Sequence, residues 1–515
     1  MKQLGILFIL ALAGCVSEPI ATKFQKPHSY SAPDFSNPDS FKKVQHAFPV
    51  IEKLYADYAE KNHFPSITYG IIVNGELVFS GATGQINLEK KTTATTKSVY
   101  RIASMSKSFT AMAILKLRDE GKLVLTDPVK KYIPQFEKVS PLTTDAAEIT
   151  IQNLMTMSAG FPEDNPWGDR QLSDTDAELM ALVENGISFA NAPGIHYEYS
   201  NLGFALLGKI VSNVSGMPYQ QFITTQILQP LGMNDSKWEF SEVPETQLAL
   251  GYRWEDEQWK EEPMLHDGSY GAMGGMLCSI EDFSKYVALH LSAWPPRNDE
   301  EAGPVKRSSI REMHQPWRFN NLFADAKTRT GEVCPVAIGY GYGLGWRKDC
   351  KGLVRISHSG GLPGFGSEWR IYPEYGIGVV SFSNGTYGAP GLPNAVALDT
   401  LIYMAGLKPR TLPAIPLLES AKGKLMDVLN DWSKAEQSGL FAENFFLDES
   451  VEKRQRATQK LFNEAGAVKQ VGIVQAENQL RGRFVIECET KNIQVFFTLT
   501  PEANPLVQQL DVWIE

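Results

Sequence analysis

The chain has 515 residues, 43% hydrophobic and 10% aromatic, which is long enough for one large domain and a smaller one. Its formal net charge of −10, without a run of basic residues, argues against nucleic acid as a partner. Beyond the first dozen residues, no apolar stretch is long enough to span a bilayer.

The beginning of the chain, MKQLGILFILALAGC, has the pattern of a secretory signal over residues 1–14. One lysine precedes a short apolar run, and small residues then lead to Cys15. The end of this stretch resembles the lipobox of bacterial lipoproteins, whose cysteine is acylated and becomes the new N-terminus. The alternative is a plain signal peptide that contains a cysteine.

The lipoprotein resemblance implies a membrane partner through an N-terminal lipid and a place in the bacterial cell envelope, facing the periplasm. Several acyl chains anchor a protein stably, because each buried methylene contributes about 0.8 kcal/mol. Val16, in place of an aspartate, favours the outer membrane. Residues 15–44, rich in proline, serine and aspartate, are predicted to be a tether.

The body of the chain, residues 45–405, predicts one α+β domain. Residues 66–81 form two β-rich runs around Asn74-Gly75, a strong hairpin signal. A buried helix is predicted from Ser104 to a stop at Gly121, because the run is apolar almost all round. Further helices are expected at 151–157 and 202–214, and strands at 340–346, 353–357, 367–372 and 377–383. This order predicts an antiparallel sheet built from both ends of the domain, with flanking helices and a helical insertion.

Four cysteines remain in a compartment that permits disulfides. Their spacing fits no zinc pattern, and no metal site is expected. Cys334 and Cys350 flank the strand-like segment GYGYGLGW. Either they form a disulfide or they are two free buried thiols.

The pattern Ser-x-x-Lys occurs three times, at Ser40, Ser104 and Ser450, and is weak alone. Ser40 lies in the predicted tether, and Ser450 opens a charged helix as an N-cap. Ser104 alone lies at the head of a buried helix, where Lys107 shares its face. A hydroxyl needs a nearby base to act as a nucleophile, and burial lowers a lysine pKa toward the free amine.

Two further motifs follow in order. Tyr199-Ser200-Asn201 precedes a helical segment, and His358-Ser359-Gly360-Gly361 ends a predicted strand. Tyr199 could instead cap the following helix or pack in the core, and Asn201 could be a plain N-cap.

Ser-x-x-Lys, Tyr-x-Asn and Lys/His-Thr/Ser-Gly together resemble the active-site serine penicillin-recognising enzymes, in particular the class C β-lactamases and their D,D-peptidase, D-aminopeptidase and esterase relatives. TIQNLMTMSAGFP, ILQPLGMNDS and GAMGGMLCSIEDFSKY also resemble that family. The resemblance covers roughly residues 45–405 and implies a serine β-lactamase/penicillin-binding fold.

The same resemblance implies the roles of the site residues. Ser104 is the nucleophile, and Lys107 and Tyr199 share proton transfer. Asn201, His358 and Ser359 bind and orient substrate, and the backbone N–H groups of Ser104 and Gly361 form the oxyanion hole. His358 stands where β-lactamases of this class carry lysine, which argues against an efficient β-lactamase and is common among the D,D-peptidase and esterase-type relatives.

The C-terminal residues are predicted to be separate. A proline-rich linker at 406–417 precedes residues 418–515, where helices at 421–433 and 451–463 precede four strands. The strands are expected at 468–475, 480–488, 493–500 and 507–514. This order predicts a small α+β accessory domain, which resembles the cystatin or NTF2 shape.

The sequence thus predicts an exported, lipid-anchored serine hydrolase that forms an acyl-enzyme on Ser104 without a metal or organic cofactor. Its substrate would be a small molecule or peptide with a D-amino-acid peptide, ester or β-lactam carbonyl. The alternative is a non-catalytic protein that binds a cell-wall peptide or penicillin in the same pocket; the intact Ser104, Lys107 and Tyr199 argue against it.

Overall fold

A computed structural model describes residues 32–33 and 38–515 of the chain. The predicted signal sequence and Cys15 lie outside the described residues. The described chain divides into two compact units, residues 32–410 and 411–515. The sequence assigned residues up to 44 to a tether, whereas Pro38–Gln45 form helix α1, whose Val44 is buried.

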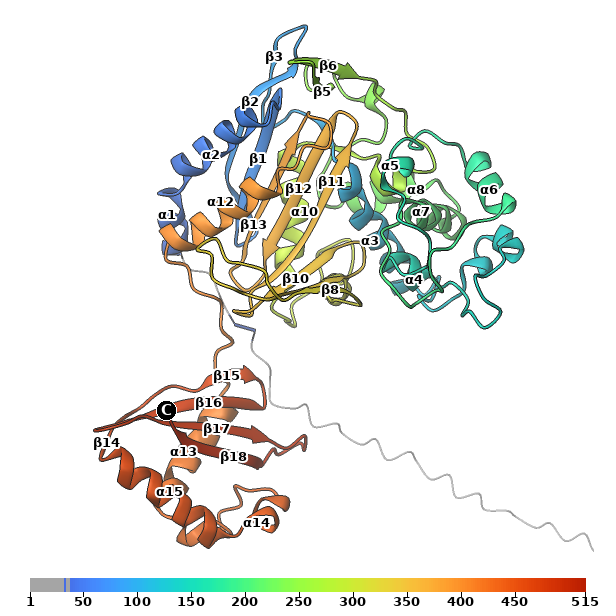
Figure 1. Ribbon diagram of the computed structural model, residues 1–515. Coiled ribbons are helices and arrows are strands. Elements are labelled where there is room, and N and C mark those ends of the chain that lie inside the picture. The colour runs from blue at the N-terminus through green and yellow to red at the C-terminus, as the bar shows by residue number, and fades with distance from the viewer. Residues whose placement is uncertain (1–31, 34–37) are drawn as a thin grey trace, which may run out of the picture. The chain divides into compact units, whose positions relative to one another are not determined.

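The larger unit is built on a nine-stranded sheet (Figure 1). In order across the sheet the strands are β3 (Thr92–Thr93), β2 (Glu76–Asn87), β1 (Ser66–Val73), β13 (Ile377–Ser383), β12 (Phe365–Tyr372), β11 (Val354–Leu362), β10 (Gly345–Asp349), β9 (Val336–Tyr340) and β8 (Arg318–Phe323). Neighbouring strands are antiparallel, and β1 pairs with β13, so the two ends of the domain meet in mid-sheet. The predicted fold class is confirmed.

The two faces of the sheet bury different cores because side chains alternate along each strand. On one face, Ile67, Tyr69 and Ile71 pack with α2 (Phe48–Lys61) and α12 (Gly391–Met404), which lie side by side in Figure 1. On the other face, Ile72 of β1 and Trp369 of β12 belong to the main core, with α10 (Ile280–Ser292). That second face carries the helical insertion.

The insertion runs between β3 and β8 and consists mainly of short helices around three long ones. The long helices are α10, α3 (Ser106–Asp119) and α7 (Asn201–Ser215), and the last two contact each other. The others are α4 (Ile151–Met155), α5 (Asn165–Gly168), α6 (Asp176–Asn185), α8 (Tyr219–Ile223), α9 (Gly271–Gly274) and α11 (Arg307–Met313). Two short strand pairs, β4 (Tyr100–Arg101) with β7 (Leu277–Cys278) and β5 (Gly251–Glu255) with β6 (Gln258–Glu262), complete it.

Several local predictions hold. Asn74 and Gly75 both have positive φ, as the tight turn between β1 and β2 requires. Gly121, at φ +73°, follows the end of α3 as predicted.

The strand predicted at 340–346 is wrong. Residues 341–344 are the turn between β9 and β10, and Gly343 has φ +69° there. The alternation of glycine and large residues imitates the two-residue period of a strand, but glycine here makes a turn.

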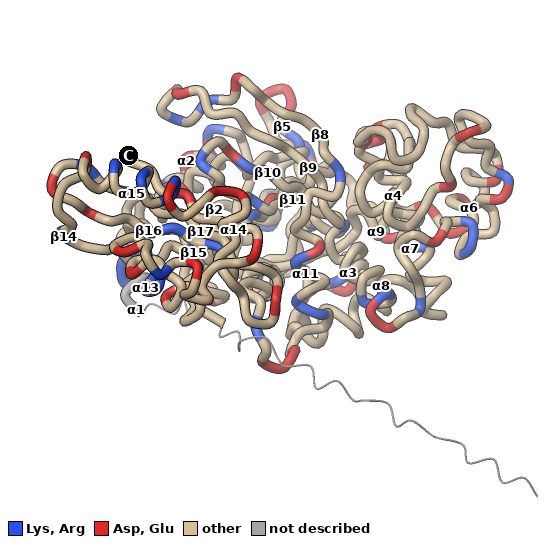
Figure 2. The backbone as a smooth tube through the Cα atoms, turned by 90° about the horizontal axis from the view of Figure 1, so that it is seen from below, with Lys and Arg blue, Asp and Glu red and all other residues tan. Residues whose placement is uncertain are grey.

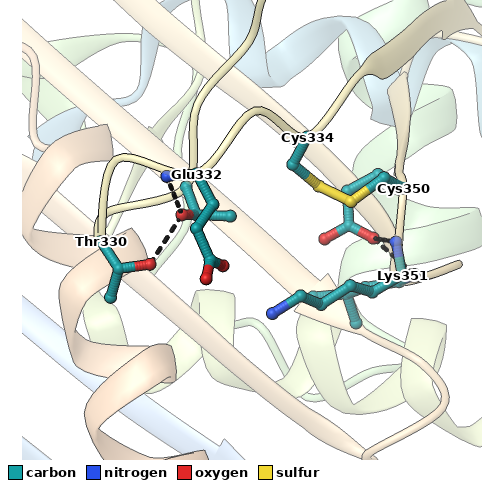
Figure 3. The surroundings of a disulfide bond; sticks show 8 residues. Thr330, Glu332, Cys334, Cys350 and Lys351 are labelled. Atoms are coloured by element: carbon teal, nitrogen blue, oxygen red, sulfur yellow. Dashed lines mark hydrogen bonds between the residues drawn. A yellow bond between two sulfur atoms is a disulfide. The ribbon is translucent and has the colours of Figure 1, made fainter.

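The same hairpin brings Cys334 and Cys350 together. They form a disulfide with a Cα–Cα distance of 5.2 Å (Figure 3). Of the two alternatives left open by the sequence, the disulfide is the one found.

The smaller unit is an α+β domain with its own hydrophobic core. Its antiparallel sheet has the order β14 (Val468–Val471), β16 (Arg481–Cys488), β17 (Ile493–Leu499) and β18 (Val507–Ile514), and β15 (Gln475–Asn478) also pairs with β16. The helices are α13 (Pro416–Asn430), α14 (Asn444–Asp448) and α15 (Val451–Ala465). The predicted strand at 468–475 is divided between β14 and β15, and α14 was not predicted.

Acidic and basic residues are interspersed along both units (Figure 2). Over the described ranges, every helix is too short or too polar to cross a bilayer.

Candidate active site

Ser104 lies in a tight turn between β4 and α3. Residues 103–105 form one turn of 3-10 helix, so α3 begins at Ser106, two residues later than the sequence suggested. Ala103, directly before Ser104, has φ +51°, a conformation that costs a non-glycine residue energy and is concentrated at functional sites. The turn holds Ser104 at the entrance of the buried helix.

Lys107, in the first turn of α3, is completely buried and points at Ser104. Its Nζ donates hydrogen bonds to Ser104 Oγ at 2.9 Å, Asn201 Oδ1 at 2.7 Å and the Met273 carbonyl at 2.9 Å. An ammonium has three donors, so this set satisfies them all. A deprotonated Lys107 would have a lone pair within reach of the Ser104 hydroxyl.

Burial lowers the pKa of Lys107 to about 7, against the opposing field of Asp169 and Asp164. A substantial fraction of the side chain is therefore the free amine at neutral pH, as a general base requires. Burial likewise raises the pKa of Asp169 to about 6.

The side chain of Tyr199 also interacts with Ser104, and this interaction lowers the Tyr199 pKa against the larger effect of burial. Its ring lies under Lys107, with Nζ 4.9 Å from the ring centre. Burial raises the pKa of Tyr199 well above its usual value, so the hydroxyl is protonated at neutral pH. The structure thus brings together the serine, lysine and tyrosine that the motifs singled out.

Asn201 is not the N-cap of α7. Ser200 has that role, because its Oγ accepts from Gly203 N at 3.1 Å. The side chain of Asn201 instead accepts from Lys107 and donates to Asn165 Oδ1 at 3.2 Å. Asn201 therefore fixes the lysine.

His358 faces the same site from β11, where its ring is held by protein atoms on both sides. Nδ1 donates to the Ser359 carbonyl at 2.6 Å, so Nε2 accepts from the Tyr340 hydroxyl at 3.0 Å. Burial and the nearby Lys107 lower the pKa of His358 to about 3. The ring is neutral at physiological pH, and both nitrogens are engaged.

A cavity of about 650 Å³ opens over these residues. It is lined by Ser104, Tyr199, His358, Ser359 and Gly361, together with Asn165, Asp169, Tyr197, Asn320, Tyr340 and Tyr387. Pairing between β10 and β11 ends at Gly345 and Ser357, so residues 358–362 lie beyond the last paired residue of β10. Ser359 and Gly361 lie where an extended substrate could align along the strand.

Two residues of the site, Asp164 and Asp169, belong to no recognisable sequence motif. Asp164 accepts from the backbone of Asn201 at 2.6 Å and of Leu202 at 2.9 Å, which orients the start of α7. Asp169 is buried in the cavity wall, where Tyr387 interacts with its carboxylate and lowers its pKa against the effect of burial. They come from loops whose position depends on the whole fold.

The other two Ser-x-x-Lys patterns lie elsewhere. Ser40 lies in α1, and Ser450 is the N-cap of α15, where its Oγ accepts from Lys453 N at 3.4 Å. In the part of the chain that the structure describes, no group of three or more His, Cys, Asp or Glu side chains is arranged to hold a metal ion.

If Lys107 acts as the base, kcat/KM for an uncharged ester should fall as the pH is lowered through the Lys107 pKa of about 7. The protonated amine cannot accept the Ser104 proton, so the enzyme is active only when Lys107 is deprotonated. A pH–rate profile between about pH 5 and pH 9 measures the acid limb, the range in which kcat/KM falls as the pH is lowered.

Asp169→Asn provides the matched test. Because the Asp169 charge raises the Lys107 pKa, its removal should shift the limb to lower pH. An unmoved limb in this variant, or a flat profile in the wild type, would contradict the assignment of the base.

Comparison with known proteins gives the family. The family model described as Beta-lactamase matches residues 51–402, more than half of the chain. Protein flp of Staphylococcus aureus strain N315 is 29% identical over 344 residues, which are 65% of this chain and 62% of that protein. Beta-lactamase-like protein 2 of Dictyostelium discoideum is 26% identical over 407 residues, 75% of this chain and 70% of that protein. The chain thus spans less than two thirds of the length of Protein flp.

Two solved structures share the fold. The octameric penicillin-binding protein homologue from Pyrococcus abyssi has 22% identity and a TM-score of 0.58, over 91% of this chain and 98% of that one. A penicillin-binding protein from Bacillus halodurans has 23% identity and a TM-score of 0.54, over 67% and 98%. With the match of the family model, these findings show that the chain belongs to the Beta-lactamase family, which supports a serine hydrolase kind of function.

Proposed function

We propose that the protein is an exported serine hydrolase that forms an acyl-enzyme on Ser104. The observation that carries the proposal is the 2.9 Å contact between Lys107 Nζ and Ser104 Oγ, because Ser104 lines an open cavity. Tyr199 adds a second proton-transfer group at the same hydroxyl. A nucleophile, a base and an adjacent acid are what acyl transfer requires.

In the proposed reaction, neutral Lys107 takes the proton of Ser104 as Oγ attacks the substrate carbonyl. The backbone N–H groups of Ser104 and Gly361 stabilise the oxyanion, as in the family pattern. Protonated Tyr199 is placed to deliver a proton to the leaving group, and it recovers one from Lys107. Hydrolysis of the acyl-enzyme follows by the reverse path with water as the nucleophile.

For the acyl donor, the site favours an ester, or a D-amino-acid peptide without a carboxylate beside its scissile bond, over a β-lactam. The cavity contains a neutral His358 where a charged group would hold a ligand carboxylate, and both ring nitrogens are already bonded. Turnover of a p-nitrophenyl ester, a D-Ala-D-Ala peptide and a cephalosporin, assayed separately, tests the proposal. Binding of all three without any turnover would favour a non-catalytic binder.

His358→Lys should shift the preference toward carboxylate-bearing β-lactams. A hydrogen bond from a charged donor is about twice as strong as a neutral one, so the ratio of kcat/KM for a cephalosporin over an uncharged ester should rise roughly fivefold or more. Measuring both substrates on both proteins at one pH gives this ratio. Fast cephalosporin turnover by the wild type would overturn the interpretation of His358.

For the location, we propose that Cys15 carries lipid and holds the enzyme to the outer membrane. Wild-type protein expressed in a bacterium should partition into a detergent phase and incorporate a palmitate analogue, and Cys15→Ser should do neither. A Cys15→Ser protein that still fractionates with membranes would show that another anchor exists.

A further inference from the structure

A second cavity, of about 490 Å³, lies on the opposite face of the same sheet. Arg355, Ser357 and Ser359 alternate along β11 with buried Ile356 and His358, so they share the face that α2 and α12 cover. All three line this cavity, together with Glu368 and Arg370 of β12 and Gly391 at the start of α12. We call it the Arg355 cavity.

One of its two arginines is neutralised. Arg370 Nε donates to Glu368 Oε1 at 2.8 Å, and its Nη2 donates to the Gly391 carbonyl at 2.7 Å. Asn394 of α12 donates to both the side chain and the backbone carbonyl of Glu368. The Arg370–Glu368 ion pair is therefore satisfied within the wall of the Arg355 cavity.

Arg355 is different, because the field of Glu368 reaches its guanidinium but no described side chain forms an ion pair with it. Among the residues that the structure describes, no hydrogen bond or ion pair involves its guanidinium, and Nε is buried without an acceptor. Burial lowers the pKa of Arg355 to about 10, which still leaves the group charged at neutral pH. A buried donor without an acceptor is costly, so such a group is expected to have a ligand.

Two further features favour a negative ligand. The wall contains two guanidinium groups against one carboxylate, so one positive charge is uncompensated. Helix α12 begins at Gly391 without a side-chain cap, and its first residues line the cavity. The positive end of a helix adds to the attraction for an anion.

The Arg355 cavity adjoins the catalytic cavity. Ser357, Ser359, Gly361 and Tyr387 line both. Arg355 and Ser359 are four residues apart on one strand, which corresponds to about 13 Å. A single extended molecule could reach from Ser104 to Arg355.

We propose that the Arg355 cavity is a subsite for an oxyanion, a carboxylate or a phosphate, carried by the substrate on the order of 10 Å from its scissile carbonyl. This inference rests on the proposed function for its link to catalysis. It differs from recognition of a carboxylate beside the scissile bond, because the group would lie beyond His358 along the strand.

Calorimetric titration of Ser104→Ala protein tests the subsite without any turnover. Glutarate and inorganic phosphate, in separate titrations, distinguish the two kinds of oxyanion. We expect at least one to bind with one site per chain, and Arg355→Gln to weaken it by at least roughly tenfold. Arg355→Lys, which retains the charge, should keep part of the affinity. Absence of binding by the parent protein, or equal binding by Arg355→Gln protein, would overturn the inference.

A substrate series tests the link to catalysis. Nitrophenyl monoesters of dicarboxylic acids of increasing length are compared with the same esters capped as methyl esters. Above a threshold length, the ratio of kcat/KM for charged over capped esters should exceed one, and Arg355→Gln should abolish that preference. Lys348→Gln, which removes an exposed charge of β10 that lines neither cavity, should retain it. A preference that survives Arg355→Gln would refute the subsite, whereas inactivity toward every ester would refute the proposed function alone.

Discussion

Lys107→Met is expected to lower kcat/KM for an activated ester by roughly 10²–10⁴-fold, the usual contribution of a general base. Methionine preserves much of the buried volume but removes the amine that lies 2.9 Å from Ser104 Oγ. Steady-state kinetics on the purified variant measure the loss.

Stability must be followed in the same variant. The substitution leaves Asn201 Oδ1 and the Met273 carbonyl without their donor, which costs about 1–3 kcal/mol for each group. Thermal unfolding shows whether the variant is folded at the assay temperature. Lys122→Met, just beyond α3 and half exposed, is the control that should keep full activity. A folded Lys107→Met enzyme with wild-type kcat/KM would rule Lys107 out as the base.

Ser104→Ala is expected to reduce ester hydrolysis to the background of the assay. Among the described residues of the site, Ser104 is the hydroxyl that interacts with both Lys107 and Tyr199. No other hydroxyl there has the base that a serine nucleophile needs. Fold should be retained, since the change removes one oxygen atom from a nearly buried side chain. Ser450 begins another Ser-x-x-Lys pattern and provides the control, because Ser450→Ala should remain fully active.

The centre of the site could be predicted from the sequence because the relative positions of its residues are determined within one helical turn. Ser104 and Lys107 are three residues apart in one turn, so the motif alone determines that they are neighbours. The order of apolar runs likewise predicted a sheet built from both ends of the domain, and in the structure β1 and β13 are the strands that pair. The strand β11 then extends through His358 to Leu362, where only its beginning was expected.

Other features depend on contacts that no local pattern encodes. Asp164 and Asp169 reach the site from a loop whose path depends on the packing of α5 and α7. The bonding of His358 depends on Tyr340, a residue of a neighbouring hairpin. Asn201 could equally have capped its helix until the position of Lys107 was known. The unpaired charge of Arg355 becomes visible only when every neighbouring acceptor has been placed.

The central claim, covalent catalysis on Ser104, is tested most directly by intact-mass measurement after brief mixing with a fluorophosphonate, followed by peptide mapping. The wild type should gain one phosphonyl group, located on Ser104, and Ser450→Ala should be labelled to the same extent. Ser104→Ala should gain none. Undiminished labelling of the Ser104→Ala protein, or a label mapped to another residue, would contradict the account.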